Sequence, residues 1–185
     1  MNTECKFEQA FDEERYLQYV NGEAAVMHCH HYATIFTKLA LDTANLGGPQ
    51  NLFDAMEETA YLTLHRYFTV EGITSSENRI SLAQQYFALA GLGQLSLESG
   101  PEGGQATMRH SHVDEGWIKK WGKNEKPVNL IGQGFLAGAT AAIYNKPVGS
   151  YSVRETQSIV TGASSSKFTL TPIRSTKKGG FANGH

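Results

Sequence analysis

Residues 132–168, GQGFLAGATAAIYNKPVGSYSVRETQSIVTGASSSKF, are the stretch that decides which fold this chain adopts. Residues 134–144 have the periodicity of a helix with small residues on one face, so another element can approach it closely. Residues 148–155 then alternate as in a strand, and Gly162 marks a reversal before a second strand at 167–170. The stretch therefore predicts a closely packed helix followed by a β-hairpin.

This pattern resembles the end of the 4-vinyl reductase-like domain family, small-molecule or hydrocarbon-binding modules in which a G-F-x-x-G helix precedes E-x2-C-x3-G-x3-C-x-F. The positions that carry the resemblance are Gly134, Phe135 and Gly138 in the helix, and Glu155, Gly162 and Phe168 in the hairpin. The match covers residues 91–172, and the N-terminal half fits the family's helical lead-in by pattern. The resemblance implies an α+β fold of the vinyl-reductase-like (TRAPP/NO-signalling-type) kind, with N-terminal helices packed on an antiparallel sheet.

The resemblance also leads to an expectation about zinc binding. In zinc-bearing relatives the two hairpin cysteines help to bind the metal, but Ser158 and Ser166 occupy these positions here. Neutral hydroxyls are poor zinc ligands beside thiolates. We therefore expect this zinc site to be absent, with Glu155 paired to a basic neighbour or to backbone donors.

Length and composition are those of one globular domain. The chain has 185 residues, 40% of them hydrophobic and 18% charged. We predict a single domain at 1–172, with a helical lead-in at 1–90 and the sheet and C-terminal helix at 91–172, followed by a flexible tail at 173–185. The net charge of −2 favours no nucleic-acid partner, and no apolar run reaches the roughly 20 residues that span a bilayer. We expect a cytoplasmic protein.

Hydrophobic periodicity places helices first and strands later. Apolar residues at three- and four-residue steps predict helices at 11–20, 23–44, 50–68 and 77–90, the last capped by Ser75 or Ser76. Residues 94–98 and 105–112 alternate like the strands of a hairpin, and 114–121 is a short helix or crossing segment. This order predicts an α+β domain whose helices cover one sheet face.

Two groups of histidines are candidate metal ligands. On a helix, His28 and His31 lie on adjacent surface, whereas His30 projects elsewhere. On a strand, His110 and His112 would face the same side. Our sharpest metal hypothesis is that His28, His31, His110 and His112 converge on a transition metal such as zinc or iron, with Asp114 or Glu115 and His65 as possible additional ligands. The alternative is that these are ordinary interface or surface histidines.

Aromatic side chains along the predicted helices suggest a pocket for an apolar ligand. Small-molecule sites are mostly apolar with a few polar groups. We predict a ligand pocket between the helices and the sheet, lined by Tyr32, Phe36, Tyr61, His65 and Trp117.

These observations favour a binding module over an enzyme. The glycines at 132, 134 and 138 lack the Lys-Ser/Thr of a phosphate-binding loop and the spacing of a dinucleotide fingerprint, so close helix packing explains them better. No serine or cysteine has a base assignable by motif, and we assign no catalytic residue. The first hypothesis is a homodimeric, vinyl-reductase-like protein that holds an apolar or aromatic molecule. The second is a metal-dependent enzyme or metal-binding protein using the histidines at the same pocket, and reduction of a tetrapyrrole vinyl group ranks last.

Overall fold

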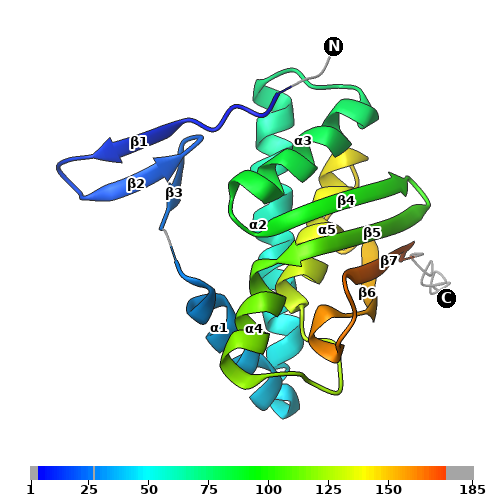
Figure 1. The fold of residues 1–185 in the computed structure, drawn as a ribbon. Helices are drawn as coiled ribbons and strands as arrows, with labels where there is room; N and C mark the ends of the chain where they lie inside the picture. Colours follow the sequence, from blue (N-terminus) through cyan, green and yellow to red (C-terminus); the bar gives the residue numbers. More distant parts are fainter. Residues whose placement is uncertain (1–3, 27, 174–185) are drawn as a thin grey trace, which may run out of the picture.

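The computed structural model describes residues 4–26 and 28–173, and its body is a four-stranded antiparallel sheet with helices packed behind it (Figure 1). The strand order is β4-β5-β7-β6. This confirms the predicted α+β architecture, with the sheet formed by the second half of the chain. The elements are β1 (Gln9–Asp12), β2 (Leu17–Val20), β3 (Glu23–Ala25), α1 (His30–Asp42), η1 (Ala44–Leu46), α2 (Gly48–Val70), α3 (Ser76–Leu89), β4 (Gly93–Gly100), β5 (Gly103–Ser111), α4 (His112–Trp121), α5 (Leu130–Ile143), β6 (Tyr151–Gln157), η2 (Ile159–Thr161) and β7 (Ser166–Pro172).

The sheet consists of two hairpins, β4–β5 and β6–β7, joined by pairing of β5 with β7. In β6 and β7 buried and exposed residues alternate, because successive side chains of a strand point to opposite faces. The buried face of β6 carries Tyr151, Val153 and Glu155. The alternation that places Tyr151 and Val153 in the core therefore also buries the Glu155 carboxylate.

Helix α5 is the centre of the core, and its glycines allow α2 to approach it. A Cβ on Gly134 would lie 2.5 Å from the carbonyl oxygen of Phe53, and a Cβ on Gly138 would lie 2.1 Å from that of Glu57. Real Cβ atoms do not come this close to backbone, so both positions require glycine. The close-packing helix predicted from the small residues is confirmed, and α5 begins four residues earlier than predicted.

A second junction joins α1 and α4. Helix α1 packs on α4 and α2 through the buried residues Ala33, Thr34, Thr37 and Ala40. The approach is close at Gly116, where a Cβ would lie 2.8 Å from the Cβ of His30. This contact brings the start of α1 beside the start of α4.

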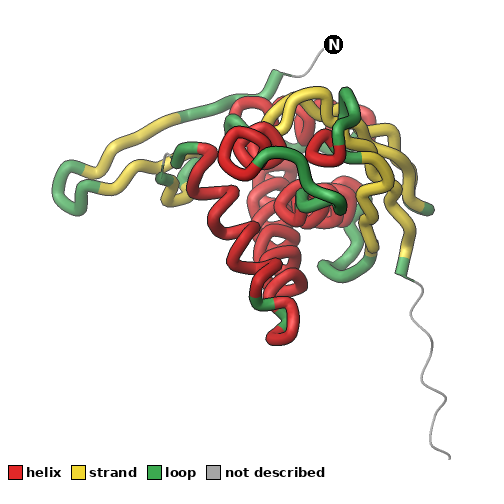
Figure 2. The backbone as a smooth tube through the Cα atoms, turned by 60° about the horizontal axis from the view of Figure 1, so that its bottom comes forward, coloured by secondary structure: helices red, strands yellow, loops and turns green. Residues whose placement is uncertain are grey.

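The N-terminal segment is a β-arm, and the helix predicted at 11–20 is wrong. Strands β1, β2 and β3 form an antiparallel meander that extends away from the body in both views (Figures 1 and 2). Asn21 and Gly22 have positive φ angles of 50° and 81°, which makes Asn-Gly the two-residue turn between β2 and β3. The amides of Glu14 and Arg15 both donate to Asp12 Oδ1 and shape the first turn. Residues 21 and 22 therefore form a hairpin turn and do not separate the helices predicted at 11–20 and 23–44.

The remaining helices lie close to their predicted positions, although the helix expected at 23–44 begins only at His30, after β3. Helix α2 includes all of the predicted 50–68, and the Ser75 hydroxyl caps α3 by accepting from Asn78 N. Among the described residues, no helix has the length and apolar character needed to cross a membrane. Of the tail predicted at 173–185, residues 174–185 lie outside the described part of the chain.

Candidate functional site

A buried polar cluster forms where β5, α4, α5 and β7 meet. Asn129 caps α5 by accepting from Gly132 N at 2.8 Å, and its amide nitrogen donates to Ser111 Oγ at 3.0 Å and to Asp114 Oδ2 at 3.1 Å. Ser166 Oγ donates to the same carboxylate oxygen at 2.9 Å. Because Ser111 also accepts from Asp114 N, at 3.2 Å, two helix caps are combined in one network.

Glu155 brings a second carboxylate to this cluster. Its Oε2 accepts from the backbone amide of Asn129 at 3.2 Å, which confirms the expected pairing with a backbone donor. Burial raises the pKa of Glu155 to about 7, and the neighbouring charge of Asp114 acts in the same direction. Burial also raises the pKa of Asp114, although the hydrogen bonds from Ser166, Ser111 and Asn129 act against it. Near neutral pH, Glu155 is therefore poised between its protonated and its ionised form.

The cluster lies at the hairpin position where the resemblance implies zinc in zinc-bearing relatives. The side chains present there do not fit zinc, because Ser158 and Ser166 supply hydroxyls where thiolates would be needed. Within residues 4–26 and 28–173, no group of three or more His, Cys, Asp or Glu residues is arranged to hold a metal ion. Asp114 Oδ1, Glu155 Oε1 and Ser158 Oγ are buried without a hydrogen-bond partner in that part of the chain. A proton on the carboxyl pair would relieve its buried charge.

The histidines meet at the α1–α4 junction in a different combination from the predicted one. The ring centroids of His28 and His112 are 5.5 Å apart, and those of His30 and His112 are 6.1 Å apart. His30, which we expected to project elsewhere, is therefore part of the cluster. The ring of His31 is tilted against that of His30, with 4.2 Å between the centroids, and His31 Nδ1 lies 3.8 Å from Cys29 Sγ. Burial lowers the pKa of His112, which favours the neutral imidazole that binds metals.

His110 and His112 do not form the predicted same-face pair, because β5 ends at Ser111 and His112 opens α4. His110 is exposed, and its Nδ1 lies 3.0 Å from Glu115 Oε1. The serine cap, which accepts from Asp114 N, was the sequence signal for a helix start at this point. His65 stacks on Tyr61 at 5.3 Å and lines a groove beside the β-arm.

The predicted aromatic pocket residues are distributed over separate parts of the molecule. Tyr32 and Phe36 are exposed on the outer face of α1, and Tyr61 packs against the main core. Trp117 is buried in a smaller core cluster with Val128 and Val160. Its ring lies 4.7 Å from that of Trp121, and within the described part of the chain its Nε1 has no hydrogen-bond partner.

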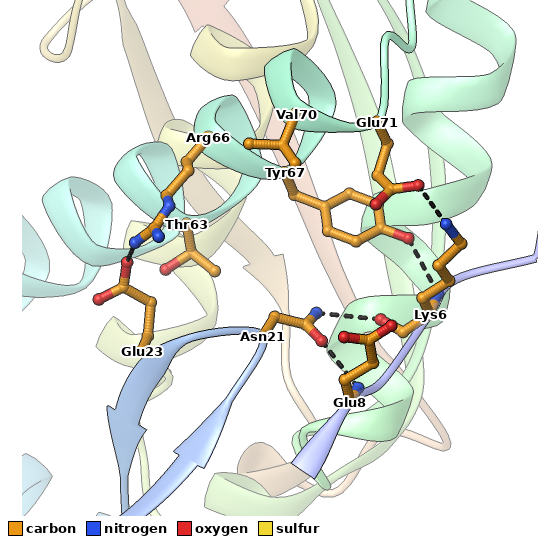
Figure 3. Close-up of a pocket in the computed structure, with 9 residues that line it drawn as sticks. All are labelled: Lys6, Glu8, Asn21, Glu23, Thr63, Arg66, Tyr67, Val70 and Glu71. Atoms are coloured by element: carbon orange, nitrogen blue, oxygen red, sulfur yellow. Dashed lines mark hydrogen bonds and ion pairs between the residues drawn. The ribbon is translucent and has the colours of Figure 1, made fainter. Parts of the chain in front are cut away.

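The hollows that stand out among the described residues lie at the surface. A notch of about 150 Å³ at the base of the β-arm is crossed by polar contacts, including the amide of Lys6 to the Tyr67 hydroxyl at 2.9 Å and the Lys6–Glu71 ion pair at 2.6 Å (Figure 3). A groove of about 530 Å³ separates β3 from α2, and a hollow of about 370 Å³ adjoins Pro49 and Tyr151. Of the predicted pocket residues, His65 lines the groove beside β3, whereas Tyr32, Phe36, Tyr61 and Trp117 line none of these three hollows.

The asparagine cap and its partners were missed at the sequence level. Asn129 precedes a long run of small and apolar residues, and this is the pattern of a helix N-cap, which would have marked it as structurally important. No local pattern links Asn129 to Glu155 or to the Ser111–Asp114 cap, since these come from three separate segments.

Comparison with known proteins identifies the fold. No family model and no curated protein sequence matches the chain. Among solved structures, the phenol-responsive sensory domain of the transcription activator PoxR with phenol has a TM-score of 0.71 at 14% identity, over 89% of this chain and 84% of that one. A vinyl-4-reductase family protein from Methanocaldococcus jannaschii has a TM-score of 0.56 at 17% identity, over 81% and 85%.

A trafficking protein particle complex subunit 3 from Naegleria fowleri, covalently bound to palmitic acid, has a TM-score of 0.52 at 9% identity, over 78% of this chain and 95% of that one. At these identities the similarity concerns the fold. The chain therefore has the vinyl-reductase-like fold that the G-F-x-x-G helix and its hairpin predicted.

Proposed function

We propose that this chain, which has a vinyl-reductase-like fold, is a binding domain for a small aromatic molecule that carries a hydroxyl or carbonyl group. The fold is shared with a sensory domain whose structure contains phenol. A ligand-binding role requires no catalytic group, and it suits a chain in which the sequence suggested no nucleophile with a base.

The observation that carries this proposal is the unpartnered N–H of Trp117. The side chain is 4% exposed, and its Nε1 makes no hydrogen bond among the described residues. A buried donor without an acceptor costs about 1–3 kcal/mol, so the site favours an occupant that supplies an oxygen. The ring neighbours are apolar, with Val128, Val160 and Ile118 beside Trp117, and this surface suits an aromatic ring.

Entry of a ligand requires one wall of this cluster to move, because Trp117 is buried and lines none of the three surface hollows. Trp121 is the wall best placed to do so. It lies at the end of α4, its side chain is partly exposed, and its ring contacts that of Trp117. Rotation of Trp121 would open a path to the Trp117 ring from solvent.

Calorimetric titration with phenol tests this proposal. We expect Trp117→Phe, which keeps an aromatic ring but removes the N–H, to weaken phenol binding about tenfold, the loss expected for one buried hydrogen bond. Tyr16→Phe is the control and should bind within about threefold of the unaltered protein, because it removes a polar hydrogen from an aromatic side chain that is 80% exposed in the β-arm. Absence of phenol binding at millimolar concentration would contradict the proposed ligand class, and equal binding by Trp117→Phe would contradict its location.

A second candidate is transition-metal binding at the α1–α4 junction, favoured by the convergence of His28, His30 and His112. The Nε2 atoms of His30 and His112 are buried and have no partner in the described part of the chain. As the rings now stand they form no ligand set, so binding requires the imidazoles to rotate toward one point.

Addition of cobalt(II) to the purified protein tests this candidate, because tetrahedral cobalt absorbs visible light. We expect one equivalent to bind, and we expect His112→Ala to lower the affinity more than tenfold by removing the imidazole shared by both ring contacts. His110→Ala is the control, since that exposed side chain pairs with Glu115. A protein that takes up no cobalt at equimolar, micromolar concentration would eliminate this candidate.

A further inference from the structure

The end of α4 and the loop after it carry a concentration of positive charge. Residues 119–126, KKWGKNEK, contain four lysines and one glutamate, which is a net charge of +3 in a chain whose net charge is −2. Lys119, Lys120 and Lys123 are exposed, and within the described part of the chain none of the three forms an ion pair with a carboxylate. Lys119 and Lys120 offset the negative end of the α4 dipole, but Lys123 lies beyond that helix. An unpaired positive patch of this kind attracts an anion.

Lys120 lies beside the proposed entrance to the Trp117 cluster. Lys120 and Trp121 follow Trp117 by three and four residues, so both project from α4 about one turn from the Trp117 side chain. The Lys120 Nζ atom lies 5.0 Å from the centre of the Trp121 ring, which is the side chain whose rotation would admit a ligand. A ligand that enters past Trp121 therefore passes an ammonium group.

Lys123 lies against η2, the short helix that supplies Val160 to the same cluster. The Lys123 Nζ atom is 3.1 Å from the position that a Cβ on Gly162 would take, and Gly162 ends η2. The backbone next to Lys123 is held in place, because Asn124 N donates to the carbonyl oxygen of Val160 at 2.9 Å. A second ammonium group is thus fixed next to the turn that packs on Trp117.

We propose that the ligand of this site is an aromatic carboxylate whose ring also carries a hydroxyl group. This ligand class rests on the proposed function and adds a negative charge to it. The ring hydroxyl accepts from the Trp117 N–H in the interior, and the carboxylate faces the Lys120 and Lys123 ammonium groups at the entrance. A ligand in this orientation satisfies the buried donor and the unpaired charges together, whereas neutral phenol satisfies only the donor.

Calorimetric titration with two matched compounds tests the charge alone. 4-Hydroxybenzoate and 4-hydroxybenzamide have nearly the same shape and the same hydroxyl group, but only the benzoate is charged at neutral pH. We expect the benzoate to bind about tenfold more tightly at low ionic strength, which is the gain that two solvent-exposed ion pairs can give. In about 0.5 M salt this preference should fall below about threefold, because salt screens exposed charges.

The variant that tests the location combines Lys120→Gln with Lys123→Gln. We expect it to reduce the preference for the benzoate to about twofold or less and to leave phenol binding within about twofold, because phenol has no carboxylate. Lys146→Gln is the matched control and should keep the tenfold preference, since this exposed lysine follows the opposite end of α5 from Val128. Circular dichroism checks that each variant is folded, and the salt dependence of the unaltered protein tests the charge without any variant.

Phenol binding separates failure of this ligand class from failure of the proposed function. If phenol binds but the benzoate and the benzamide bind equally, the charged ligand class is wrong and the proposed function stands. If neither phenol nor the benzoate binds at millimolar concentration, both are overturned. A preference for the benzoate that the double lysine variant leaves unchanged would overturn the assignment of the carboxylate to Lys120 and Lys123.

Discussion

Substitution of Gly138 by alanine is expected to destabilise the protein by about 3 kcal/mol or more, because the added methyl would overlap the α2 backbone. The new Cβ would lie 2.1 Å from the Glu57 carbonyl oxygen and 2.9 Å from Tyr61 N. Both contacts are backbone atoms of a long helix, so no side-chain rotation relieves them. Helix α5 is buried along nearly its whole length and has little room to shift.

An opposing effect is smaller. Alanine favours a helix over glycine by about 1 kcal/mol, so the propensity gain offsets only part of the steric cost. Urea unfolding followed by circular dichroism measures the balance. Gly100→Ala is the control, because that glycine has open space around its Cβ position and no positive φ angle, and we expect its unfolding free energy to change by less than about 0.5 kcal/mol. A Gly138→Ala variant as stable as the unaltered protein would refute the close-packing role.

The second large effect is a pH dependence that Glu155 creates. Its folded-state pKa of about 7 is above the ordinary value of 4.5, so the folded protein holds a proton that the unfolded chain releases. The contribution to stability is therefore complete below pH 4.5 and is lost as the pH rises through 7. The expected loss is about 3 kcal/mol, since each tenfold difference in proton affinity corresponds to about 1.4 kcal/mol.

Glu155→Gln tests this directly, because glutamine is isosteric and does not titrate. As the pH is raised from 5 to 8, we expect the unfolding free energy of the variant to rise by about 2.5 kcal/mol relative to that of the unaltered protein. Asp114 has its own raised pKa and is coupled to Glu155 by charge, so the difference between the two proteins includes the loss of this coupling. Glu115→Gln is the control, since that neighbouring carboxylate is largely exposed and should change the pH profile little. Parallel profiles for Glu155→Gln and the unaltered protein would rule out a titrating role for Glu155.

The histidine predictions show that residue spacing predicts neighbours correctly only where the secondary structure is also predicted correctly. Spacing paired His28 with His31 and His110 with His112, whereas the ring contacts in the structure join His28 and His30 to His112. Both differences come from the expected secondary structure. A strand extended through His112 put His110 on the same face, whereas in the structure Ser111 ends that strand and caps a helix. The predicted helix began at residue 23, which placed His30 on a different face from His28 and His31. In the structure α1 begins only at His30.

The sequence by itself determined the parts of this protein that depend on neighbouring residues. The small residues of 132–143 specify a helix that another element can approach closely, and the alternation of the last two strands specifies which side chains are buried. The features that depend on contacts between distant segments were decided only by the tertiary structure. The polar cluster combines Ser111, Asp114, Asn129, Glu155 and Ser166 from separate segments. The exposure of Tyr32 and Phe36 depends on which face of α1 is covered by α4, because the same 3.6-residue period describes a helix whether or not a partner packs on it.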